Sequence, residues 1–171
     1  MSDNDGDVIE LLTRDHQALR GLVEELDSEE DAARLRILFE VFVRKLASHE
    51  AGEQQVIFPA FSDAVRAGAT AARRRNDEHE EINELLAEMR NLTPDDAGFE
   101  KRAGALNVEI EAHFAAEEED VFPQLRASFT PGELMALGDQ VRAVEETAPP
   151  FPEPVLTQHV HAEHRPKRIR S

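Results

Sequence analysis

The chain has 171 residues, a formal net charge of −17 and no cysteine, tyrosine or tryptophan. This length suits one domain with a buried core, and the missing cysteines exclude disulfides, iron–sulfur clusters and thiolate zinc sites. The acidity argues against nucleic-acid and membrane-surface binding. Because there is no membrane-length apolar run and no signal-peptide pattern, we expect a cytoplasmic protein.

The first two predicted helices span residues 6–26 and 29–58. In both, apolar residues recur every three or four positions, which is the pattern of a helix that buries one face. A histidine interrupts each apolar stripe, His16 in the first helix and His49 in the second. Pro59 either kinks the second helix or lies near its end.

Two further long helices are predicted over residues 70–91 and 95–122, after Gly68 interrupts the chain. Their apolar stripes hold His79 and His113 in the same way. No strand pattern accompanies them. Long helices with short connections predict an all-α fold, an up-down-up-down four-helix bundle.

A short fifth helix is predicted over residues 131–146, because a capping box begins at Thr130. Residues 147–171 are rich in proline and histidine and end in basic residues, which predicts a disordered tail. The expected organisation is a bundle over 1–128, an additional helix over 129–146 and this tail. The basic end of the tail could fold back on the acidic bundle or contact a partner.

The two halves of the chain repeat each other. Residues 48–61, SHEAGEQQVIFPAF, correspond to residues 112–125, AHFAAEEEDVFPQL, which lie 64 positions later. Both segments hold a histidine, a glutamate four positions on and then a Phe-Pro pair. Two stacked hairpins of this kind would bring six polar side chains together across the core. These six are His16, His49, Glu53, His79, His113 and Glu117.

Six polar side chains on apolar stripes predict a metal centre. A lone histidine there is usually a satisfied core residue, but six unpartnered groups would each cost about 2 kcal/mol or more. Four imidazoles and two carboxylates are too rich in nitrogen for calcium or magnesium, and too numerous for one catalytic zinc. The set suits a pair of iron or manganese ions bridged by the carboxylates.

The ordered motifs resemble the hemerythrin-like family, the hemerythrin HHE cation-binding domain, over residues 8–126. The resemblance rests on the four histidines, two of them followed by a glutamate at the fourth position and then by Phe-Pro. It implies a four-helix bundle around two non-haem iron ions with an oxo or hydroxo bridge. The histidines would be terminal ligands, and Glu53 and Glu117 would bridge.

One position departs from the family pattern. Oxygen-carrying members have a further histidine one turn after the one on the third helix, where this chain has Asn83. The resemblance therefore implies a more open site, which favours reaction with small oxidants over reversible oxygen transport. Glu50, next to His49, is a candidate to compensate for the missing ligand.

The functional prediction is a protein that binds dioxygen, peroxide or nitric oxide for sensing, buffering or protection against oxidative stress. A catalase-like or peroxidase-like enzyme that decomposes hydrogen peroxide is an alternative. A metal-stabilised interaction protein is a further one. The expected partners are small ligands rather than nucleic acid or membranes, and the sequence is compatible with a monomer.

Overall fold

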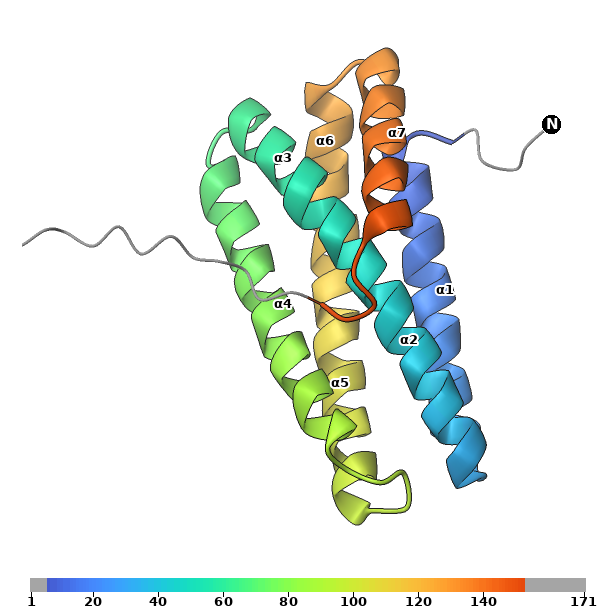
Figure 1. The fold of residues 1–171 in the computed structure, drawn as a ribbon. Coiled ribbons are helices and arrows are strands. Elements are labelled where there is room, and N and C mark those ends of the chain that lie inside the picture. Colours follow the sequence, from blue (N-terminus) through green and yellow to red (C-terminus); the bar gives the residue numbers. More distant parts are fainter. Residues whose placement is uncertain (1–5, 153–171) are drawn as a thin grey trace, which may run out of the picture.

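Four long helical segments lie side by side and form the bundle (Figure 1). The structure, a computed structural model, describes residues 6–152. No strand occurs in that range, so the predicted all-α bundle is confirmed. The segments begin with α1 (Val8–Ser28), α2 (Ala32–Gly52), α4 (Gly68–Arg90) and α5 (Ala97–Ala116).

Two of the segments continue beyond their predicted ends at residues 58 and 122. A π-helical turn, η1 (Glu53–Ile57), leads from α2 into α3 (Phe58–Ala64). The matching turn η2 (Glu117–Val121) leads from α5 into α6 (Phe122–Ser128).

The predicted ends are wrong because the two prolines do not stop the helices. Pro59 and Pro123 lack the N–H group that a regular helix needs. Each lies just after a wider turn, in which the N–H of Phe58 donates to the Glu53 carbonyl and that of Phe122 to the Glu117 carbonyl. The wider turn accommodates a proline that would break a regular α-helix.

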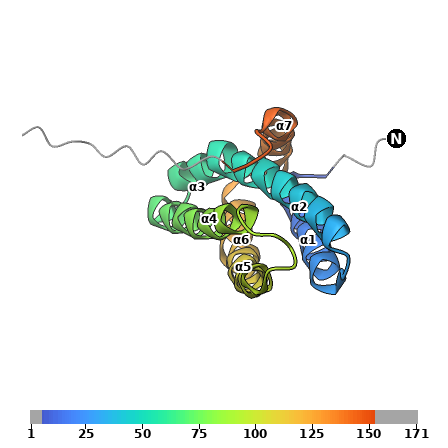
Figure 2. The same ribbon diagram turned by 60° about the horizontal axis from the view of Figure 1, so that its bottom comes forward.

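The predicted fifth helix is α7 (Pro131–Thr147), which begins with the expected capping box of Thr130 and Glu133. It lies outside the four-helix arrangement, against α1, α2 and η1 (Figure 2). The contact with the end of α2 is close, because a Cβ on Gly52 would lie only 2.8 Å from Cγ1 of Val141. A larger residue than glycine would push α7 away from the bundle.

The apolar core consists of two clusters at different heights. The upper cluster joins α7 to the ends of the segments that contain α3 and α6, and includes Phe61 and Leu125. The lower cluster fills the other end of the bundle and includes Phe39, Phe42 and Leu86. Each fully buried side chain of this size contributes about 1.5–3 kcal/mol. The six candidate ligands fall between the two clusters in every segment.

The chain after α7 crosses α2 toward α4 (Figure 1). Phe151 packs against the lower cluster, with the Arg90 guanidinium 4.3 Å from the centre of its ring, and Pro152 is buried. The predicted disordered tail, 147–171, thus begins with a segment that lies on the bundle. Its remainder, 153–171, lies outside the described residues. No helix within residues 6–152 is long and apolar enough to cross a membrane.

Candidate metal centre

The structure brings all six predicted ligands into one buried layer. Each is at most 2% exposed to solvent. Every one of the four bundle segments contributes a histidine, and the two glutamates come from the second and fourth segments. The layer consists of His16, His49, Glu53, His79, His113 and Glu117.

These side chains form two groups that share both carboxylates. His16 and His49 complete one group, called here the first position, and His79 and His113 complete the other, the second position. Within each group the candidate ligand atoms all lie within 4.8 Å of one another. Such a group is the size of a metal site.

Each carboxylate reaches a histidine of both positions. Glu53 Oε1 lies 3.3 Å from His49 Nε2, and its Oε2 lies 3.2 Å from His79 Nε2. Glu117 Oε2 lies 3.3 Å from His16 Nε2, and its Oε1 lies 3.4 Å from His113 Nε2. A carboxylate with one oxygen on each side is arranged to bridge two metal ions.

Unsatisfied polar atoms show that these residues fit a metal. All four oxygens of Glu53 and Glu117 are buried without a hydrogen bond, as are Nε2 of His16 and Nε2 of His49. Buried polar atoms without partners are rare and costly. Nitrogen and carboxylate donors around two positions suit iron, manganese or zinc. Cations here would satisfy these atoms.

Three of the six groups in the metal-free layer, His16, Glu53 and His79, have charge states that favour binding, whereas the pKa of His49 is raised, because the effect of burial is outweighed by the charge of Glu53 and the contact with Asp15. Burial and the neighbouring charge of His49 lower the pKa of His16 to about 4, and burial and His113 do the same for His79. Burial alone would raise the pKa of Glu53, but the charges of His49 and His79 lower it. Neutral imidazoles with an ionised carboxylate are the forms that bind a metal. Burial and the charge of Glu53 raise the pKa of Glu117 well above its usual value, an effect that a cation would reverse.

Both carboxylates stand at the start of a π-helical turn, Glu53 in η1 and Glu117 in η2. π-Helical turns inside α-helices are frequent at functional sites. Sequence reasoning missed them, although the Phe-Pro pair that follows each glutamate was their visible signal. The repeat thus encodes the turn together with the ligands.

A second ring of side chains lies beside the outer nitrogens of the histidines and hydrogen-bonds three of them, and sequence reasoning missed it too. Acceptor oxygens lie 2.8 Å from Nδ1 of His16 and His113 and 3.9 Å from Nδ1 of His49, whereas an amide nitrogen lies 3.1 Å from Nδ1 of His79. Partners of this kind fix the ring orientation and tune the ligand. The partner of His16 is Glu118, that of His113 is Glu78, the neighbour of His49 is Asp15, and the partner of His79 is Gln54. The repeat could have revealed these side chains, because Asp15 and Glu78 occupy corresponding positions in its two halves, as do Gln54 and Glu118.

Glu50 and Asn83 lie together but outside both ligand groups. The Asn83 amide donates to Oε2 of Glu50 at 3.1 Å, while Oε1 of Glu50 is buried without a partner. Burial raises the pKa of Glu50 to about 8. A cavity of about 40 Å³ adjoins Glu50 and Gln54, with Pro149 and Pro152 on its outer side.

Comparisons with known proteins identify the family of the chain. The family described as hemerythrin HHE cation binding domain matches residues 7–125, with a second, overlapping match over 78–147. An uncharacterized hemerythrin-like protein of Schizosaccharomyces pombe is 21% identical over 86% of this chain and 73% of its own length. The uncharacterized protein Rv2633c of Mycobacterium tuberculosis is 27% identical over 78% of this chain and 82% of its own.

A solved structure supports the fold independently. It is the crystal structure of a hemerythrin HHE cation binding domain-containing protein from Mycobacterium kansasii, a homolog of Rv2633c. It superposes with a TM-score of 0.74 and 23% sequence identity, covering 83% of this chain and 86% of the other. Since the family matches most of the chain, and the fold and buried histidine–glutamate layer agree with it, the chain belongs to the hemerythrin HHE cation binding domain family.

Proposed function

We propose that the layer holds two non-haem iron ions and binds dioxygen, or a related small oxidant such as peroxide or nitric oxide. The role would be sensing, buffering or protection against oxidative stress. The observation that carries this proposal is the unequal access to the two positions. Gln54, the partner of His79 in the second position, lines a small cavity together with Glu50, whose Oε1 is buried without a partner. By contrast, Phe114 stacks on His16 of the first position.

The first position is covered on one face by an aromatic ring. Phe114 is fully buried and stacks on His16, with ring centres 3.9 Å apart and planes 10° from parallel. The Arg20 guanidinium lies 5.4 Å from the centre of the same ring and pairs with Glu118, the partner of His16. Phe114 thus blocks one face of the His16 imidazole.

Asn83 follows His79 of the second position by one helical turn and contacts Glu50. The cavity of about 40 Å³ that Glu50 and Gln54 line exceeds the roughly 10–15 Å³ of free volume that a cavity needs to hold one water molecule. It can therefore hold a molecule of a few atoms, such as dioxygen, peroxide or nitric oxide.

The residues of the second position also offer a proton. Bound iron would supply the electrons and the open coordination positions that such ligands require. Because the pKa of Glu50 is raised to about 8, its carboxyl is mainly protonated at pH 7 in the metal-free chain. Asn83 holds Oε2, so the unpartnered Oε1 is the atom that can donate to a ligand.

A peroxide-decomposing enzyme is the second candidate, and Glu50 is the observation that favours it. Conversion of two hydrogen peroxide molecules into dioxygen and two water molecules moves protons between oxygens. A buried carboxyl that is half-protonated near pH 8 is suited to that transfer. The Glu50→Gln change would leave iron binding intact and stop turnover if this candidate is correct.

The test begins with metal analysis and the optical spectrum of the purified protein, before and after peroxide is added. We expect about two iron ions per chain. Gas evolution on adding peroxide would favour the enzyme, and a stable spectral change without turnover would favour ligand binding. An iron-free protein, or one with a single zinc, would overturn the proposal.

The Asn83→His variant tests the access argument. It adds an imidazole beside the second position, and we expect a longer-lived dioxygen complex with slower turnover of peroxide. Asn91→His, at the exposed end of α4, is the matched control. An optical spectrum under dioxygen that is the same in both variants would contradict the open second position.

A further inference from the structure

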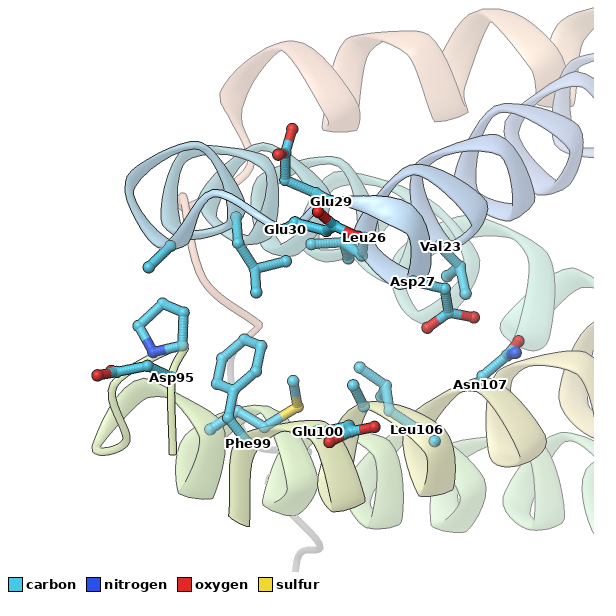
Figure 3. A pocket seen from close by; sticks show the side chains of 16 residues that line it. Val23, Leu26, Asp27, Glu29, Glu30, Asp95, Phe99, Glu100, Leu106 and Asn107 are labelled. Atoms are coloured by element: carbon cyan, nitrogen blue, oxygen red, sulfur yellow. The ribbon is translucent and has the colours of Figure 1, made fainter. Parts of the chain in front are cut away.

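A pocket of about 550 Å³ opens at the end of the bundle that the lower cluster fills, between α1, the start of α2 and α5 (Figure 3). Its floor is apolar and includes Leu26, Met89 and Phe99, which belong to the lower cluster. The volume lies within the range of about 300–1,000 Å³ that is usual for ligand pockets. Nothing in the proposed function uses this pocket.

The rim of this pocket is acidic. Five carboxylates line it and no basic residue does: Asp27, Glu29, Glu30, Asp95 and Glu100. Glu29 pairs with Arg34 at 3.2 Å, and the other four form no ion pair within residues 6–152. Carboxylates of one sign around an apolar floor attract a segment that is both basic and apolar.

The chain itself contains a segment of this kind. Residues 165–171, RPKRIRS, have four basic residues, no acidic residue and one large apolar residue, Ile169. The rest of the molecule is strongly acidic, since the whole chain carries a charge of −17. This segment is therefore complementary to the rim in charge and to the floor in polarity.

The end of the described chain lies within reach of the pocket. Phe151 packs against the lower cluster, which also supplies the pocket floor, and it contacts Arg90, the neighbour of Met89 in sequence. The residues between Pro152 and Arg165 can span up to about 43 Å when extended. That exceeds the roughly 35 Å length of α4, which has 23 residues.

We propose that residues 165–171 dock in this acid-rimmed pocket of the same chain, with Ile169 toward the apolar floor and the basic side chains on the rim carboxylates. The docked segment would contact α1, the start of α2 and α5 at the end of the bundle away from the metal layer. The proposal does not depend on which metal or ligand the layer holds.

The test uses a fluorescent reporter in the full-length chain. The chain has no tryptophan or tyrosine, so Ile169→Trp supplies its one indole. At low salt we expect blue-shifted emission and severalfold weaker quenching by acrylamide than in a free peptide of residues 153–171 with the same change. At 1 M salt the Debye length falls to about 3 Å and the protection should decline. Emission identical to that of the free peptide would overturn the proposal.

Two variants in the Ile169→Trp background test the location. A Cβ on Gly104, which lines the pocket, would have no atom within 4 Å, so Gly104→Leu adds bulk to the pocket wall from a position with room for a side chain. The pair Glu30→Lys and Asp95→Lys reverses the rim charge. Both should abolish the protection of the indole.

The matched control changes charge elsewhere by the same amount. Glu84→Lys with Glu109→Lys alters two exposed carboxylates that do not line the pocket. It should leave the protection of the indole nearly unchanged. Equal loss in the control and rim variants would overturn the proposed location. Protection that rises with protein concentration would mean docking in a second copy, which also contradicts docking within one chain.

Discussion

The first and second positions come from two halves of one repeat, yet their surroundings differ at three corresponding places. The first position has Phe114, Arg20 and Glu118 where the second has Glu50, Asn83 and Gln54. The ligands themselves correspond one to one. The repeat has kept its six candidate ligands and changed the side chains around them, so the two positions differ in their surroundings.

The charges differ in part between the two positions. Beside the first position, Arg20 donates to Glu118 at 2.8 Å and to Glu111 at 2.7 Å, and this ion-pair network contacts His16. Beside the second position, the Gln54 amide contacts His79 and is neutral, whereas His113 contacts Glu78, which pairs with Arg75 at 2.8 Å. We infer that the first position mainly retains its metal, whereas the second one meets the ligand.

Removing a candidate ligand from one position should have the largest effect on bound iron, and it tests directly whether the two positions differ. His113→Ala takes a nitrogen from the second position and leaves a buried space beside Glu117. We expect bound iron to fall by about half or more, since both carboxylates that serve the remaining metal stay in place. Iron per chain, measured by elemental analysis after gel filtration, is the readout.

His159→Ala, in the part of the chain after residue 152, is the control for His113→Ala and should retain its iron. Full iron in the His113→Ala protein would mean that the ligand assignment is wrong. A complete loss of iron would show that the two positions fill only together.

Changing the pH should have a smaller effect, on the free energy of unfolding of the metal-free chain. The pKa of Glu50 is about 8 in the folded chain, against 4.5 for an exposed glutamate. The folded state therefore holds this proton more tightly, and the stability that it provides is lost as the pH rises toward 8. The pKa values of His16 and His79 are lowered, so these two residues change the stability with pH only below about pH 6.5.

Between pH 6.5 and 8 the free energy of unfolding should thus fall, by up to about 1.4 kcal/mol per pH unit from Glu50. Urea unfolding followed by circular dichroism measures it. Glu50→Gln should reduce this slope, and a remainder is expected because the pKa values of Glu117, His49 and Glu145 are also raised. A parent chain that gains stability over this range would contradict the buried, protonated Glu50.

The sequence predicted the bundle and the six side chains that the structure places in one layer, because both depend on spacing along single helices. His49 and Glu53 are four residues apart, so one helix places both on the same face. The π turns and the continuation past Pro59 depend on how a missing N–H is accommodated, which periodicity does not reveal. Stripe patterns also say nothing about which helix lies opposite, so the contact of Glu118 with His16 was not anticipated.

The smallest expected effect comes from exchanging the outer partners. Gln54→Glu gives His79 of the second position the carboxylate partner that His16 has, and Glu118→Gln gives His16 the amide. A carboxylate makes the imidazole a stronger donor and stabilises the more oxidised metal. A tenfold change in affinity between oxidation states corresponds to about 60 mV for one electron.

We therefore expect Gln54→Glu to lower the reduction potential of the second position by tens of millivolts. The difference between the potentials of the two positions should then shrink. Glu118→Gln should raise the potential of the first. Redox titration followed by Mössbauer spectroscopy resolves the two irons. Because each variant keeps a hydrogen-bonding side chain of the same size, iron content should stay unchanged. Equal shifts in the reduction potentials of both irons would mean that the outer partners do not distinguish the positions.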